Sequence, residues 1–189
     1  MQRTASTHSA RFAPNVASGW LARRWYYTPR THRAYSVRQI SPGDRRLLAE
    51  FTLALSGGGA HRDPAGVHDL SDMLFDRVLV GGSDMSVGFA ALESTAGGDR
   101  VIGVAAYAPV NLETARFGIA VAATHRDEQV GRILLATLIR HAKRVGIRRL
   151  GAEMLWSNRP MHMLAQAMGF TIEPVARDRN LRHLVLSLK

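Results

Sequence analysis

The chain has 189 residues, of which 46% are apolar; this size and composition suit one α/β domain with an appendage, or at most two very small domains, and exclude a disordered protein. It contains no cysteine, so disulfides, thiolate metal sites and an acyl-cysteine intermediate are excluded. The formal net charge is +10, but residues 1–43 hold seven arginines and no acidic residue. Because much of the excess charge lies in that segment, we do not expect the rest of the chain to bind nucleic acid.

Residues 1–33 are predicted to be a basic, disordered N-terminal arm. Their arginine-rich, serine-containing and acid-free composition is also typical of a transit peptide. Aromatic residues at positions 20 and 25–27 lie among the arginines, so contact with a membrane surface, nucleic acid or the folded body is an alternative. Residues 34–189 are predicted to form one domain. No apolar run reaches the roughly 20 residues that span a bilayer, so we expect a cytoplasmic protein.

Alternating and helical periodicities predict the first elements of this domain. A strand is followed by two helices, each ended by a run of glycines. Two strands joined by a hairpin-like loop come next, and a third strand is almost continuously apolar or small, as a strand covered on both faces would be. These predicted elements are strand 35–40, helices 45–54 and 67–80, and strands 86–93, 101–109 and 114–123.

After this third strand the apolar residues change to a helical spacing. They predict helix 131–145, with basic residues in its last turn and Gly146 as its C-terminal stop. A strand over 148–155 and a short helix over 160–168, opened by a proline, follow. Strands 170–175 and 181–188 are expected to form a final hairpin.

The junction between strand 114–123 and helix 131–145 is a candidate anion site. A tight loop runs directly into the first turn of the helix, where free backbone N–H groups and the positive end of the helix dipole attract phosphate. Gly131 lets backbone amides approach an anion closely, and Arg126 and Arg132 add positive charge. On these residues alone, an ordinary turn whose glycine serves packing is an equal alternative.

Asn158 stands at a second strand-to-helix junction, and the short helix after it ends at Gly169-Phe170. Its side chain either hydrogen-bonds an amide-rich ligand or simply caps the helix, a role that asparagine favours.

Together these motifs resemble those of the GNAT superfamily of N-acetyltransferases. The family's phosphate loop, Gln/Arg-x-x-Gly-x-Gly/Ala, is matched by Arg126 and Gly131, with Gln129 in the place of the first glycine. The family's later signature of an asparagine, a short helix and Gly-Phe is matched by Asn158 and Gly169-Phe170. The sequence of residues 158–170 is similar to that of bacterial protein-lysine acetyltransferases of the Pat kind.

The resemblance implies an α/β (α+β) architecture, the GNAT fold, for residues 34–189. Its sheet is expected to be mixed but mostly antiparallel, with six to seven strands flanked by helices and splayed between the fourth and fifth strands. The implied activity is that of an acetyl-CoA-dependent N-acyltransferase, which passes the acetyl group directly to a primary amine on a protein lysine or a small molecule. Acetyl-CoA is the implied co-substrate, and no metal is expected.

The resemblance also implies which residues bind acetyl-CoA. Backbone groups of the third strand would bind the pantetheine arm, amides of the loop would hold the pyrophosphate, and an N–H near Val121 would polarise the thioester carbonyl. The implied cofactor-binding residues are Ile119, Ala120, Val121, Arg126, Asp127, Glu128, Gln129, Val130, Gly131, Arg132 and Asn158.

Two positions depart from the family pattern. Gln129 replaces a glycine beside the phosphates, so we expect weakened CoA binding. Arg116 stands where many relatives carry glutamate, and arginine cannot act as a base at neutral pH. We therefore predict Glu113, at the mouth of the same strand, as the catalytic residue, with His125 as the alternative. Weaker candidates are Glu153 and His162 as the base, and Glu93 and Tyr107 as lining of the acceptor site.

These departures leave a second function open, a non-catalytic acyl-CoA-binding sensor or regulatory module with a degenerate active site. The final hairpin, an element through which such folds often pair, leaves a homodimer open as well.

Overall fold

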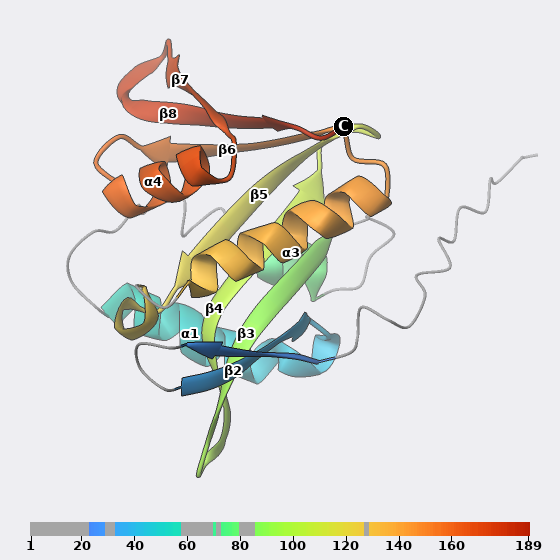
Figure 1. The fold of residues 1–189 in the computed structure, drawn as a ribbon, viewed down its shortest axis with the longest axis vertical. Helices are drawn as coiled ribbons and strands as arrows, with labels where there is room; N and C mark the ends of the chain where they lie inside the picture. The colour runs from blue at the N-terminus through green and yellow to red at the C-terminus, as the bar shows by residue number, and fades with distance from the viewer. Residues whose placement is uncertain (1–22, 29–32, 58–69, 71–72, 80–85, 127–128) are drawn as a thin grey trace, which may run out of the picture.

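The computed structural model describes residues 23–28, 33–57, 70, 73–79, 86–126 and 129–189. Within these residues, eight strands form one sheet in the order β1-β2-β3-β4-β5-β6-β8-β7 (Figure 1). Neighbouring strands are antiparallel except for the parallel pair β5 and β6. The strands are β1 (Arg24–Thr28), β2 (Arg33–Gln39), β3 (Val87–Thr95), β4 (Gly98–Pro109), β5 (Thr114–Val121), β6 (Arg149–Leu155), β7 (Thr171–Val175) and β8 (Asp178–Ser187).

Helices cover both faces of the sheet (Figure 1). On one side, here the α3 face, lie α3 (Val130–Arg144) and α4 (Arg159–Ala167). On the other, the α1 face, lie α1 (Arg45–Gly57) and the π-helix η2 (Met73–Val78). Two short 3-10 turns, η1 (Pro42–Asp44) and η3 (Ala123–His125), precede α1 and follow β5. No helix among the described residues is long and apolar enough to cross a membrane.

The sequence-predicted elements from residue 35 onward are confirmed, with two qualifications. The helix expected over 67–80 is described only at residue 70 and over 73–79, and its main described part is a π-helix rather than an α-helix. The sheet has eight strands, so the expected count of six to seven is wrong.

The additional strand, β1, lies inside the segment predicted to be an arm. Tyr26 pairs with Tyr35 of β2 and their rings stack at 5.7 Å between centroids. The guanidinium of Arg23 binds the carboxylate of Asp99 from the β3–β4 hairpin. Aromatic residues favour strands, and here the arginine-rich composition concealed that preference. The sheet therefore begins at Arg24, and the rest of the predicted arm lies largely outside the described residues.

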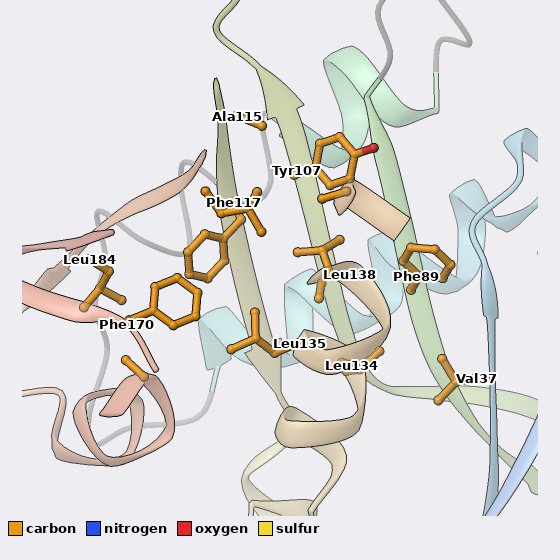
Figure 2. Close-up of a cluster of buried hydrophobic side chains, with 14 of the residues drawn as sticks. Val37, Phe89, Tyr107, Ala115, Phe117, Leu134, Leu135, Leu138, Phe170 and Leu184 are labelled. Carbon is orange, nitrogen blue, oxygen red and sulfur yellow. The ribbon is translucent and has the colours of Figure 1, made fainter. Parts of the chain in front are cut away.

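Side chains of β5 alternate between the two faces of the sheet. Ala115, Phe117, Ile119 and Val121 belong to the core on the α3 face, which Figure 2 shows in part. The intervening residues 114, 116, 118 and 120 therefore point to the α1 face, since successive side chains of a strand alternate. This alternation decides which residues of β5 can meet a ligand from which side.

A hydrogen bond between two buried side chains links the sheet to α3. The hydroxyl of Tyr107 on β4 lies 3.0 Å from Nδ1 of His141, and the imidazole also meets the ring of Phe89. Burial, with a smaller contribution from the charge of Arg144, lowers the pKa of His141 from 6.5 to about 4. Burial also raises the pKa of Tyr107. Both side chains are therefore neutral at physiological pH.

This buried histidine should make the protein less stable in mild acid. The unfolded chain binds a proton at His141 near pH 6.5, while the folded chain does so only near pH 4. The contribution of His141 to the free energy of unfolding is therefore fully present above pH 6.5. It is lost as the pH falls from 6.5 to 4, by about 3 kcal/mol at most. Urea denaturation of wild type and His141→Gln at several pH values measures this contribution. The variant should lose less stability over that window, and equal losses in the two proteins would show that His141 does not titrate as stated.

Candidate functional site

The parallel strands β5 and β6 pair only at one end. Their register joins Thr114 to Arg149, Ala115 to Leu150 and Arg116 to Gly151, and no further pair follows among the described residues. Over the same stretch β5 stays paired with β4, and β6 stays paired with β8 along its whole length. The edge of β5 from residue 117 to 121 therefore has no strand partner on the side of β6. We call this divergence the β5–β6 opening, and it confirms the expected splay.

Two aromatic rings close the narrow end of the β5–β6 opening on the α3 face. Phe117 follows the last paired residue of β5, and its ring lies 5.2 Å from that of Phe170, between centroids (Figure 2). Gly169, with φ +82°, adopts the left-handed conformation that ends α4 and brings Phe170 into the core. The Gly-Phe motif thus has a structural task, which is to seal the opening where the strands meet.

The other end of the opening leads to the N-terminus of α3. After β5 the chain makes the η3 turn, and α3 begins at Val130, where the side chain of the N-cap residue Gln129 makes no capping hydrogen bond. The first backbone N–H groups of a helix attract anions, and Gln129 does not occupy those of α3. Arg126 and Arg132, both exposed, flank them. Asp127 and Glu128 of the predicted phosphate loop lie outside the described residues.

Gly131 marks the point where α3, β5 and α4 meet. A Cβ atom at this position would lie 3.5 Å from Leu164 of α4, 3.5 Å from Val121 and 4.0 Å from Ile119. These are ordinary van der Waals distances, so a methyl group fits but a larger side chain would enter the space between β5 and α4. The predicted residues Ile119, Val121, Val130 and Gly131 are thus brought together.

Gln129 has the backbone conformation that the family's glycine would favour. Its φ of 60° and ψ of 5° are left-handed, and it is the one non-glycine residue with positive φ among the described residues. Its side chain is exposed, and its carbonyl accepts the N–H of Ile133 at 3.0 Å. Gln129 therefore carries the backbone strain that a left-handed conformation imposes on a residue with a side chain.

His125 is buried beneath this loop, with 1% of its surface exposed. Its Nδ1 lies 2.8 Å from the hydroxyl of Thr124, and its Nε2 lies 3.6 Å from a carboxylate oxygen of Glu93. Burial raises the pKa of Glu93, but the hydrogen bond from Arg100 and the charges of His125 and Arg100 outweigh it, so that the pKa lies below its usual range. We conclude that Glu93 is ionised and anchors His125, which fixes the start of the loop.

Asn158 caps α4. Its Oδ1 accepts the backbone N–H of Met161 at 3.2 Å, which leaves the NH₂ group of the amide for another partner. His162, on the same helix, packs edge-on against the ring of Trp156, at 5.0 Å between centroids. Both residues belong to the helix that lies on the α3 face.

Glu113 lies ahead of the closed end of the β5–β6 opening. Its carboxylate is 3.5 Å from Arg148 with 63% of the side chain exposed, and its carbonyl accepts the N–H groups of Arg148 and Arg149. Three residues, or about 10 Å of strand, separate it from Arg116, after which the strands diverge. The structure does not bring Glu113 to the opening.

His183 of β8, which the sequence patterns do not single out, lies beside the closed end instead. Its Nε2 is 3.4 Å from the position that a Cβ of Gly151 would occupy. The position of His183 over Gly151 follows from the register of β6 and β8 and not from local sequence, because 32 positions separate His183 from Gly151.

A cavity of about 300 Å³ lies on the α1 face, away from the β5–β6 opening. Its lining comes from α1, from the start of β4 and from residues 122–126, and it includes His125. It shares the start of the phosphate loop with the opening but reaches it from the opposite side of the sheet. In the described part of the chain, no three His, Asp or Glu side chains gather where they could hold a metal ion.

Comparisons with known proteins identify a family for this arrangement. The model of the acetyltransferase (GNAT) family matches residues 62–170, more than half of the chain. A search of curated proteins gives no match.

Solved structures share the fold at low sequence identity. The GNAT domain of S. lividans PAT is 21% identical, with a TM-score of 0.64 over 91% of this chain and 99% of that chain. The putative acetyltransferase yncA from Salmonella typhimurium, solved with acetyl-CoA, is 21% identical, with a TM-score of 0.60 over 82% of this chain and 94% of that one. A cAMP-binding acyltransferase from Mycobacterium smegmatis is 18% identical, with a TM-score of 0.61 over 90% of this chain but 48% of that one.

Replacing Gln129 with glycine should stabilise the protein. The left-handed conformation costs a residue with a side chain about 1–2 kcal/mol, and glycine avoids this cost. The entropy that glycine loses on folding costs about 0.5–1 kcal/mol. The gain is larger than the loss, so the free energy of unfolding should rise by about 0.5–1 kcal/mol. Chemical denaturation measures it. Gln129→Ala is the matched control, because alanine keeps the strain and should gain nothing. A glycine variant no more stable than the alanine variant would contradict this account of the loop.

Proposed function

Because the chain belongs to the GNAT acetyltransferase family, we propose that it transfers the acetyl group of acetyl-CoA directly to a primary amine, on a protein lysine or a small molecule. The observation that carries the proposal is that the β5–β6 opening leads to the N-terminus of α3, which the side chain of Gln129 does not cap. An unpaired strand edge and a helix N-terminus are complementary to the amides and the diphosphate of CoA, respectively.

The residues at this junction fit acetyl-CoA as the co-substrate. The N–H groups of the first turn of α3 would bind the diphosphate, with Arg126 and Arg132 adding charge. The free edge of β5 at Ile119 and Val121 would hydrogen-bond the pantetheine arm as an added strand does. The side chain of Leu164 would border the arm from α4.

The closed end of the opening supports a position for the thioester. On the α3 face the Phe117–Phe170 contact would prevent the pantetheine arm from extending further along β5. The reacting carbonyl would therefore lie near Phe117, and a backbone N–H of the free β5 edge there would stabilise the oxyanion, rather than the N–H near Val121. Because the chain has no cysteine, an acyl-cysteine intermediate is excluded, and in the proposed reaction the amine itself attacks the carbonyl.

The acceptor would approach from the α1 face, since α3, α4 and the two phenylalanines cover the other. On the α1 face Leu70 packs against Gly118, where an added Cβ would lie 3.0 Å from its Cδ1. Among the described residues, Leu70 thus covers the middle of β5, and the acceptor would approach at Arg116 and Gly151, where the strands part.

The sensor alternative is less well supported. It was motivated by Gln129 and Arg116, and the left-handed backbone of Gln129 keeps the loop in a conformation suited to glycine. Arg116 cannot act as a base at neutral pH, but the β5–β6 opening and its connection to α3 are present in the structure.

Release of CoA in the presence of acetyl-CoA and a panel of amines tests the proposed activity. The absence of cysteine means that a thiol reagent detects CoA without a background from the protein. We expect thiol release that depends on the amine, together with acetylated product by mass spectrometry. Binding of acetyl-CoA without turnover across amino acids, polyamines and lysine peptides would favour the sensor, and absence of binding would contradict both.

Substitutions at Gly131 test the binding site itself. Gly131→Ala should fold and bind acetyl-CoA nearly as wild type, because its Cβ meets neighbours at 3.5 Å or more. Gly131→Glu should reduce the affinity at least tenfold, because it places a carboxylate beside the diphosphate and between β5 and α4. Calorimetric titration measures both, with circular dichroism as the check on folding. Equal affinities in the two variants would rule out this position for the diphosphate.

A further inference from the structure

The acceptor side of the β5–β6 opening carries a histidine. On β5, β6 and β8 the residues that point to the α1 face alternate with those in the core of the α3 face, which include Leu150, Met154 and Leu184. By this alternation Arg116, Gly151, Glu153 and His183 share the α1 face, the side from which the acceptor would approach. Glu153 is directly opposite His183 in the register of β6 and β8.

The imidazole of His183 leans from its own strand over Gly151. Although His183 pairs with Glu153, its Nε2 lies 3.4 Å from where a Cβ of Gly151 would be. Glycine at 151 thus leaves the space that the ring occupies. Gly151 in turn pairs with Arg116, the last paired residue before the strands diverge. Neighbouring strands are about 4.8 Å apart, so the imidazole lies about one strand away from the narrow end of the opening.

The charged groups around this imidazole leave it as the base best placed to meet an amine. Glu153 on β6 is engaged by Arg177, at 2.5 Å. Glu173 on β7 pairs with His183 from the outer side of the sheet, further from the opening. Arg116 on β5 is permanently charged, and a fixed cation at the opening disfavours the ammonium form of an incoming amine.

We propose that His183 is the general base of the acetyl transfer, an assignment that rests on the proposed function. The amine nitrogen forms the new N–C bond to the acetyl carbonyl, and Nε2 of His183 accepts the proton that this nitrogen loses. The C–S bond then breaks, CoA leaves as the thiolate, and the proton passes from the imidazole to the thiolate. Histidine suits this task because it gains and loses a proton near neutral pH.

The test compares steady-state kinetics of wild type, His183→Gln and His183→Ala over a range of pH. We expect kcat to fall at least a hundredfold in both variants, with the affinity for acetyl-CoA by calorimetry within twofold of wild type. The acidic limb of the wild-type pH profile should be absent from His183→Gln. Free imidazole in the buffer should restore part of the activity of His183→Ala, which a purely structural role would not allow.

His162→Gln is the matched control, because His162 lies on α4 at the other face of the sheet and packs against Trp156. It should keep the wild-type rate and pH profile. Wild-type kinetics in His183→Gln, or loss of the acidic limb in Glu153→Gln instead, would overturn the assignment while leaving the proposed function intact. A wild-type protein that binds acetyl-CoA but acetylates no amine would overturn both.

Discussion

The structure depends on one feature, which is that β5 and β6 pair at only three positions among the described residues although each keeps its other partner strand. Along its whole length β6 is hydrogen-bonded to β8, and β5 is hydrogen-bonded to β4 from Gly103 to Pro109. Phe117, the first residue of β5 beyond its pairing with β6, contacts Phe170, which follows α4. The backbone groups left unpaired along β5 need partners, and an extended ligand rich in amides supplies them.

Packing around the opening makes its two faces unequal. On the α3 face Leu164, Gly131 and the two phenylalanines form a lining that suits an extended, mostly apolar arm. On the α1 face Leu70 covers Gly118, whereas Arg116, Gly151 and His183 lie where the strands part. Co-substrate and acceptor would then enter from opposite sides and meet between the strands. The two departures from the family pattern affect different parts of the site. Gln129 adds backbone strain before α3, and Arg116 points to the α1 face, from which the acceptor would approach.

The sequence predicted the strands and helices of the body because their periodicities are local properties of the chain. It missed β1, because seven arginines near the N-terminus made the aromatic run at 25–27 look like part of an arm. The phosphate loop is a prediction from Gly131 and its flanking arginines, whereas the splay was expected only from the family resemblance and is confirmed by the register of β5 and β6. His125 was expected beside the phosphates, but its anchoring by Glu93 depends on a contact between distant strands. His183 could not be found from local patterns, because its position over Gly151 follows from tertiary register.

The account can be tested most directly by titrating ¹⁵N-labelled protein with CoA and following the backbone amide signals. It predicts saturable changes at Ile119, Val121, Val130 and Gly131, on the free edge of β5 and the first turn of α3. Changes confined to Ala54, Leu55 and Val101, around the cavity on the α1 face, with the edge of β5 unaffected, would contradict it.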